Sequence, residues 1–194
     1  MARILILAGG CRGRRLAGEL VGEGHAVRVT TRGESGRAAI EATGAECWIG
    51  TPGRLATLRA ALESVTIVCW LLGTAIGSED ELGVLHASRL EFFLGQVIDT
   101  TVRGFVYEAP GGGGDGDGGG GGGGGGGDGG GGGGGDGAVP ANVFVEGERI
   151  VRRLAERNEI PARFLRADPG EPEVWLREAR AAIGALLLGR YPET

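Results

Sequence analysis

The residues best suited to chemistry in this sequence form a glycine turn close to its start. The apolar run Arg3–Leu7 is followed by Gly9, Gly10 and Gly13, and then by a helical pattern that extends to Glu23. A buried strand, a tight turn and a helix N-terminus together direct backbone N–H groups and the positive end of the helix dipole toward an anion. The pyrophosphate of a dinucleotide is the anion that this combination typically binds.

The glycine spacing of this turn is incomplete. Gly10 and Gly13 match the last two glycines of G-x-G-x-x-G or of G-x-x-G-x-x-G, and the first glycine is replaced by Ala8 or Leu7, depending on the register. Gly10 allows the backbone to approach phosphates, and Gly13 allows the helix to pack closely on the strand. A turn of small residues that binds no ligand is the alternative interpretation. The residues expected to line the phosphate site are Gly10, Cys11, Arg12 and Gly13.

The end of the second expected strand bears on the identity of the nucleotide. NAD-binding domains usually place Asp or Glu there, where the carboxylate bonds the ribose hydroxyls. This chain has Thr30, Thr31 and Arg32 at that point. A carboxylate repels a 2′-phosphate, whereas hydroxyls and a guanidinium bind it. We therefore predict NADP rather than NAD, with Thr31 and Arg32 at the 2′-phosphate and Arg12 as a second positive contact.

Strand and helix patterns alternate along the chain. The expected strands are Arg3–Leu7, Ala26–Thr30, Glu46–Ile49, Thr66–Leu72, Gly104–Glu108 and Ala162–Arg166. The expected helices are Gly13–Glu23, Ser35–Thr43, Leu55–Glu63, Leu82–Thr101, Asn142–Arg157 and Pro172–Leu188. This alternation predicts an α/β fold with a doubly wound, six-stranded parallel sheet of order 3-2-1-4-5-6, in three α/β/α layers. We expect one Rossmann domain over residues 1–194, with no separate substrate domain.

A low-complexity segment interrupts this plan. Residues 111–137 contain 23 Gly and four Asp, and such a composition cannot bury a core, so we expect a disordered insertion. Neither the EF-hand spacing nor the calcium β-roll repeat is present in it. A flexible lid and a neutral expansion are the two interpretations of this segment, and its composition favours the second.

Composition excludes several classes of function. The net charge is −5, with no basic stretch that would indicate nucleic acid or anionic membrane as a partner. Cys11, Cys47 and Cys69 have unrelated spacings, so we expect neither a disulfide framework nor a metal site. The longest apolar run, Ile67–Ile76, is too short to cross a bilayer. We predict a cytoplasmic protein.

Three segments resemble the atypical branch of the short-chain dehydrogenase/reductase superfamily, a branch of NAD(P)-binding Rossmann proteins that includes the nitrogen-metabolite-repression regulators and the flavin/biliverdin reductases. They are GHAVRVTTR (24–32), IGTPGRLATLRAALESVTIV (49–68) and GFVYEA (104–109). The resemblance implies NADP(H) binding through Arg32. It also implies an adenine contact after Gly50, where the family usually has Asp and this chain has Thr51. The family often has Ser or Thr after the tyrosine that matches Tyr107, and here Glu108 follows it.

The usual catalytic pair of the wider superfamily is Tyr-x-x-x-Lys on the fifth helix, where the lysine lowers the tyrosine pKa. All 20 basic residues of this chain are arginine, and its tyrosines are Tyr107 and Tyr191, so that pair is missing. Two functions remain open: a cofactor-binding or sensor module with weak or no catalysis, and an NADPH-dependent reductase that takes its proton from solvent and acts on a small-molecule substrate. In the second case Leu71, Leu72, Gly73 and Thr74 would border the nicotinamide.

Three further features are weaker indications of function. We interpret His86 as a solvent-facing residue near a helix start, with a catalytic role as the alternative. Glu108 is a minor candidate for a general base, because it ends a strand at the ligand edge of the sheet. The apolar stripe of residues 90–99 is explained by sheet cover, and Phe92, off its centre, leaves a homodimer as the alternative.

Overall fold

The computed structural model describes residues 1–111 and 140–189. The predicted insertion, apart from Gly111, and Tyr191 lie outside the described residues. In the described ranges, no helix combines the length and the apolar character that a bilayer crossing needs.

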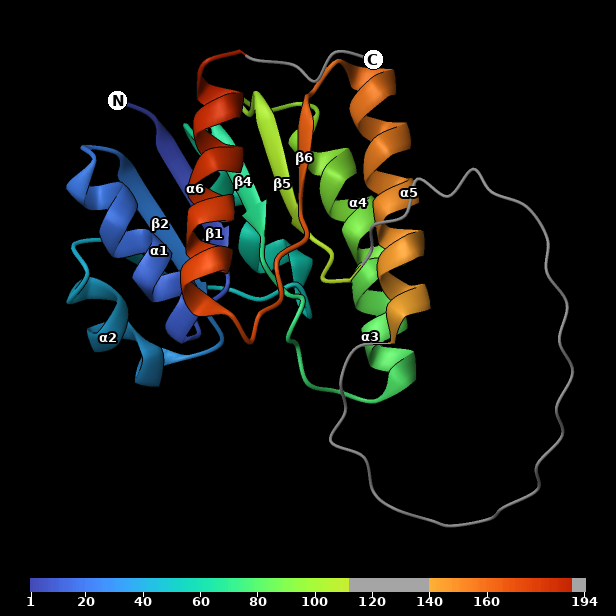
Figure 1. The fold of residues 1–194 in the computed structure, drawn as a ribbon, viewed down its shortest axis with the longest axis horizontal. Helices are drawn as coiled ribbons and strands as arrows, with labels where there is room; N and C mark the ends of the chain where they lie inside the picture. Colours follow the sequence, from blue (N-terminus) through green and yellow to red (C-terminus); the bar gives the residue numbers. More distant parts are fainter. Residues whose placement is uncertain (112–139, 190–194) are drawn as a thin grey trace, which may run out of the picture.

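Six strands of the described residues form one sheet, in which every neighbouring pair is parallel (Figure 1). The order is β3-β2-β1-β4-β5-β6, which confirms the predicted topology. The strands are β1 (Arg3–Leu7), β2 (Ala26–Thr31), β3 (Glu46–Ile49), β4 (Ile67–Trp70), β5 (Gly104–Glu108) and β6 (Ala162–Leu165). Because the order reverses between β1 and β4, a crevice is expected at their carboxyl ends.

Helices cover both faces of this sheet (Figure 1). The helices are α1 (Cys11–Gly22), α2 (Arg37–Glu41), α3 (Glu79–His86), α4 (Ser88–Val97), α5 (Ala141–Asn158) and α6 (Pro172–Leu187). Residues of α1, α2 and α6 pack in one apolar cluster, and residues of α4 and α5 pack in the other.

Strand β1 shows why such a sequence folds between two layers. Ile4 and Ile6 pack in the cluster of α1 and α6, whereas Leu5 and Leu7 pack in the cluster of α4 and α5. Successive side chains of a strand point to opposite faces, so an unbroken apolar run suits a strand that is buried on both sides.

The segment predicted as one helix over Leu55–Glu63 is not an α-helix. It forms two short 3-10 segments, Leu55–Leu58 and Ala60–Leu62. The Thr57 hydroxyl donates to the carbonyl of Arg54 at 2.6 Å, and the Thr57 carbonyl accepts from the Trp48 indole at 2.8 Å. Side-chain bonds of this kind compete with the regular helical ladder.

The helix predicted over Leu82–Thr101 begins earlier and is divided in two. Ser78 and Glu81 form a capping box at the start of α3, which satisfies backbone N–H groups at that end. Ala87, with φ −111° and ψ −96°, separates α3 from α4. This break allows His86, the last residue of α3, to turn into the core while α4 packs on the sheet.

The glycine turn gives a test of the packing between α1 and β1. A Cβ atom at Gly13 would lie 1.9 Å from the backbone oxygen of Ala8, whereas a Cβ at Gly10 would meet no atom within 4 Å. We expect Gly13→Ala to lower the free energy of unfolding by about 2 kcal/mol or more through overpacking, and Gly10→Ala to lower it by less than about 1 kcal/mol, because alanine is only a poorer N-cap than glycine. Urea denaturation of the two variants measures this, and equal stabilities would contradict the close packing.

Candidate functional site

A crevice of about 650 Å³ opens at the carboxyl ends of β1, β2 and β4. It is lined by the glycine turn, the end of β2, the loop after β3, the loop after β4, the start of α3, Arg89 of α4 and Trp175 of α6. This is the place where open α/β sheets bind ligands, because loops from both sides of the topological switch point meet there.

The glycine turn forms the floor of the crevice. Leu7, the last residue of β1, leads through Gly9 and Gly10 into α1, for which Gly10 is the N-cap. The first N–H groups of a helix have no acceptor within the helix, and the helix dipole adds positive potential there. Because Gly10 has no side chain, a phosphate can approach these N–H groups closely.

Two arginines line the crevice without a hydrogen-bond or ion-pair partner in the described ranges. Arg32 follows β2 and is exposed. Arg89 lies on α4, with Nη1 3.8 Å from the position that a Cβ of Gly53 would take. Hydrogen bonds from Ser78 lower the pKa of Glu81, which also lines the crevice, and Arg89 is close enough to that carboxylate to lower it further. No acid is paired with Arg32 in the described ranges, so Arg32 is the cation most available to an anionic ligand. Sequence reasoning missed Arg89, whose only sequence signal is its place early in the helical segment after β4.

The loop after β3 forms the wall next to β2. The N–H of Gly50 donates to the carbonyl of Thr31 at 2.9 Å, so this loop lies directly beside the end of β2. The Thr51 hydroxyl accepts a 3.3 Å bond from the N–H of Gly53, and the N–H of Thr51 donates to the Thr57 hydroxyl at 3.1 Å. The structure thus brings Thr31, Arg32 and Thr51 together on one side of the crevice.

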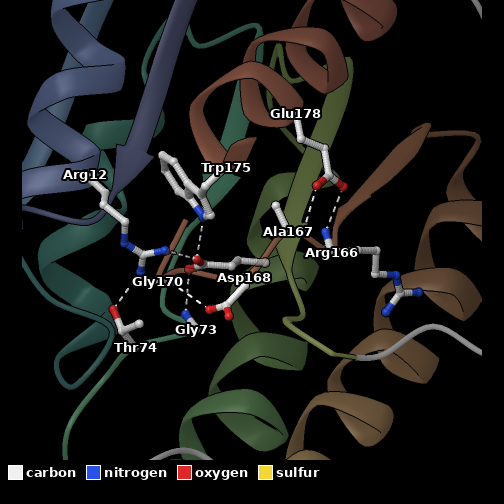
Figure 2. Close-up of polar contacts among 10 residues, drawn as sticks. Arg12, Gly73, Thr74, Arg166, Ala167, Asp168, Gly170, Trp175 and Glu178 are labelled. Carbon is white, nitrogen blue, oxygen red and sulfur yellow. Dashed lines mark hydrogen bonds and ion pairs between the residues drawn. The ribbon is translucent and has the colours of Figure 1, made fainter. Parts of the chain in front are cut away.

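The opposite side of the crevice is built around the carboxylate of Glu108, which is fully buried. Its Oε1 accepts from Arg12 Nη1 at 2.8 Å and from the Trp175 indole at 2.7 Å. Its Oε2 accepts from the N–H of Gly73 at 2.7 Å. Arg12 also donates through Nη2 to the Thr74 hydroxyl at 2.7 Å. Figure 2 shows Arg12 of α1, Trp175 of α6, and Gly73 and Thr74 of the loop after β4 directed toward one another.

The first turns of α6, which carry Trp175, are held by hydrogen bonds to the loop after β6. The carboxylate of Glu178 accepts from the N–H groups of Arg166 and Ala167, at 2.8 and 2.7 Å, in the loop after β6 (Figure 2). Asp168 accepts from the N–H of Gly170 at 2.7 Å in the same loop. These bonds order the loop that leads into α6, and with it the position of the indole.

The sequence interpretation of Glu108 as a minor candidate for a general base is not supported by this geometry. Both oxygens of the carboxylate accept hydrogen bonds from groups of the protein, and the side chain has no exposed surface. A general base needs a free lone pair within reach of the substrate proton. Glu108 instead compensates the charge of Arg12 and holds Gly73.

The prediction of a solvent-facing His86 is wrong. The ring is fully buried, and its Nδ1 lies 2.7 Å from the hydroxyl of Tyr107. The ring of Phe144 packs against it in a T-shaped arrangement, at a centroid distance of 5.2 Å. Burial lowers the pKa of His86 to about 4, against a smaller opposing effect of the Leu72 carbonyl. Burial also raises the pKa of Tyr107, with Glu148 and Glu108 as further causes. The pair is therefore neutral at pH 7 and lies in the core, behind Leu72.

Of the four residues predicted to border the nicotinamide, three line the crevice and Gly73 does not. Leu71, Leu72 and Thr74 line it. The N–H of Gly73 is turned away from it toward Glu108, and a Cβ at Gly73 would come within 2.7 Å of that side chain. Apolar side chains of α3, Leu82 and Leu85, complete this part of the wall.

Comparison with known proteins agrees with this architecture. No protein-family model matches the sequence, and no curated protein matches it. Solved structures do match. UDP-glucose 4-epimerase from Thermotoga maritima, with UDP-glucose, is 16% identical with a TM-score of 0.61, over 84% of this chain and 54% of that one. Citrobacter sp. triphenylmethane reductase complexed with NADP(H) is 15% identical with a TM-score of 0.57. That match covers 85% of this chain and 49% of the reductase.

A short-chain dehydrogenase/reductase superfamily protein from Agrobacterium tumefaciens, with bound NAD, is 18% identical with a TM-score of 0.59. The match covers 99% of this chain and 63% of that protein. The chain thus spans about half to two thirds of the length of these structures. At these identities the likeness shows the fold alone, and that fold is the predicted one.

The buried histidine predicts a pH dependence of stability. The unfolded chain binds a proton at His86 below its ordinary pKa of 6.5, whereas the folded protein binds it only below about 4. The stability is therefore complete above pH 6.5 and falls between pH 6.5 and 4, by up to about 3 kcal/mol from this group.

The matched variant is His86→Asn, whose amide oxygen can accept from the Tyr107 hydroxyl but does not titrate. Urea denaturation between pH 4 and 7 should show a steeper loss for the wild type than for the variant. Parallel curves would show that His86 is not buried in a neutral state.

Proposed function

We propose that this chain binds NADP(H) in the crevice, in preference to NAD(H), as a cofactor-binding or sensor module with weak or no catalysis of its own. The observation that carries the proposal is the guanidinium of Arg32, which has no partner among residues 1–111 and 140–189 and lines the same crevice as the N-terminus of α1. A dinucleotide places its pyrophosphate at such a helix end and its adenosine ribose at the end of the second strand.

The residues on the side of β1 to β3 fit a 2′-phosphorylated adenosine. The N–H groups of the turn at Gly10–Gly13 would hold the pyrophosphate, and Cys11 lies at its exposed rim. Arg32, assisted by the Thr31 hydroxyl, would bind the 2′-phosphate through charge-assisted hydrogen bonds. In this half the lining of the crevice contains no carboxylate that would repel a 2′-phosphate at the end of β2.

The loop after β3 is the adjacent wall, and the adenine would lie against it. Thr51 replaces the acid that the resembling family has there, so acceptors for the adenine amino group come from the backbone. Arg89 approaches the same loop at Gly53 and is placed to stack its guanidinium on the purine ring. This arrangement binds the base mainly by stacking and positive charge.

The preference for a module over an efficient enzyme rests on the groups near the crevice. The chain contains no lysine, Tyr107 is buried against His86, and the carboxylate of Glu108 is fully engaged. Classical proton transfer needs an acid or base in contact with the substrate. None of these groups offers one at the crevice.

An NADPH-dependent reductase that uses a solvent proton is the second candidate. The apolar wall formed by Leu71, Leu72, Leu82 and Leu85 favours it, since such a wall suits a nicotinamide and a small apolar substrate. NADPH oxidation in the presence of flavins or quinones tests it. A cytoplasmic location and a homodimer through Phe92, which is exposed on α4, stay predictions.

The role of Arg32 is tested by the variant Arg32→Gln. Because a hydrogen bond to a charged group contributes about 1.5–3 kcal/mol, we expect NADPH affinity to fall about tenfold to a hundredfold. NADH affinity should change by less than about threefold, since NADH has no 2′-phosphate. Calorimetric titration and thermal stabilisation with both ligands measure these affinities.

The control for this experiment is Arg59→Gln, which removes another exposed arginine outside the crevice. It should leave the affinities for both ligands unchanged. Equal losses of NADPH and NADH affinity in Arg32→Gln would contradict the assignment of the 2′-phosphate, and no binding of either ligand to the wild type would contradict the proposed function.

A further inference from the structure

The two halves of the crevice differ in how much of their edge is free. In a Rossmann fold each half of the sheet receives one nucleotide of the dinucleotide. On the side of β1 to β3, the first N–H groups of α1 have no acceptor within the helix, and Arg32 has no partner in the described part of the chain. On the side of β4 to β6, the Thr74 hydroxyl, the buried carboxylate of Glu108 and the Trp175 ring are already in contact with Arg12.

Arg12 crosses from the first half to the second. It is the second residue of α1, and its guanidinium reaches the loop after β4 and the end of β5. Nη2 donates to the Thr74 hydroxyl at 2.7 Å, and Nη1 donates to Glu108 at 2.8 Å. The guanidinium carbon also lies 4.7 Å from the centroid of the Trp175 ring (Figure 2). The side chain therefore lies across the carboxyl ends of β4 and β5, where a nicotinamide nucleotide would be expected.

This position of Arg12 is held firmly. Glu108 is fully buried, and its other donors, the N–H of Gly73 and the Trp175 indole, belong to fixed elements. If Arg12 moved away, a buried carboxylate would lose the one cation bound to it in the described ranges, and uncompensated buried charge is strongly unfavourable. A ligand that needs the space of the guanidinium would have to compensate this cost.

We propose that the crevice recognises the 2′-phosphorylated adenosine diphosphate part of its ligand and leaves the nicotinamide outside, in solvent. The ligand class is then adenosine with a 2′-phosphate and a 5′-diphosphate, for which the nicotinamide adds no affinity. This inference rests on the proposed function, because it takes the adenosine half to lie over β1 to β3. It explains how a dehydrogenase fold can report on phosphorylated nucleotides without transferring hydride.

The first test compares NADPH with 2′-phospho-ADP-ribose, which lacks the nicotinamide, on the wild-type protein. Calorimetric titration should give dissociation constants within about twofold of each other. The emission of bound NADPH should match that of NADPH in solution, because its nicotinamide remains hydrated. NADPH binding at least about tenfold tighter, with enhanced nicotinamide emission, would overturn the inference and leave the proposed function standing. Binding of neither ligand would overturn both.

The second test removes the obstruction with the double variant Arg12→Ala/Glu108→Gln. Removing both charges avoids leaving a buried carboxylate unpaired. We expect NADPH to bind several times more tightly than 2′-phospho-ADP-ribose in this variant, with enhanced nicotinamide emission. An unchanged ratio, in a variant that still binds 2′-phospho-ADP-ribose, would show that Arg12 does not exclude the nicotinamide.

The matched control is Arg15→Ala/Glu173→Gln. Arg15 and Glu173 form another ion pair between α1 and α6, at 2.7 Å, but both side chains are largely exposed and neither lines the crevice. This control should keep the ratio of the wild type. A change of the ratio in the control equal to that in the test variant would mean that any loosening of α1 against α6 admits the nicotinamide, which would contradict the specific role of Arg12.

Discussion

The buried carboxylate of Glu108 is the group on which the crevice depends. A carboxylate without exposed surface must be compensated by donors, and here the donors come from three directions: Arg12 of α1, Gly73 after β4 and Trp175 of α6. Meeting this requirement fixes the first turn of α1, the loop that leaves β4 and the start of α6 relative to β5. The arrangement of α1, α6 and the loop after β4 at the crevice is therefore a consequence of compensating the charge of Glu108.

The same interaction makes the two halves of the crevice unlike each other. Arg12 binds Glu108 and Thr74, so its positive charge is compensated within the protein. Arg32 has no such partner in the described ranges, and the helix N-terminus at Gly10 adds a further positive contribution. Free positive potential is therefore concentrated on the side of β1 to β3. A phosphorylated adenosine is the ligand that matches this distribution best.

Much of this could be predicted from the sequence, for identifiable reasons. Runs such as Arg3–Leu7 are apolar on both faces, so buried parallel strands and the order of the sheet follow from pattern and connection rules. The places of the glycine turn and of Arg32 at the crevice follow from their fixed distance to the first and second strands. These features are local in sequence, or they are tied to the strand ends that the topology brings together.

The features that escaped prediction depend on contacts between distant residues. Arg12 and Glu108 are separated by 96 positions, so the sequence shows an arginine in a turn and an acid after a strand, but not their pairing. His86 has acidic neighbours in sequence, which suggested exposure, yet Tyr107 accommodates it in the core. The residues after β3 have helical composition, but the bonds of Thr57 to Arg54 and Trp48 override it. In all three places, side-chain contacts that the sequence pattern does not reveal determine the structure.

The most direct test of the account uses ligands without any nicotinamide. Calorimetric titration of the wild-type protein with adenosine 2′,5′-bisphosphate and with adenosine 5′-monophosphate isolates the 2′-phosphate. The account predicts that the bisphosphate binds at least about tenfold more tightly, and that this advantage shrinks as salt screens the arginine. Equal affinities, or binding of neither ligand at millimolar concentration, would contradict the claim that this crevice recognises a 2′-phosphorylated nucleotide.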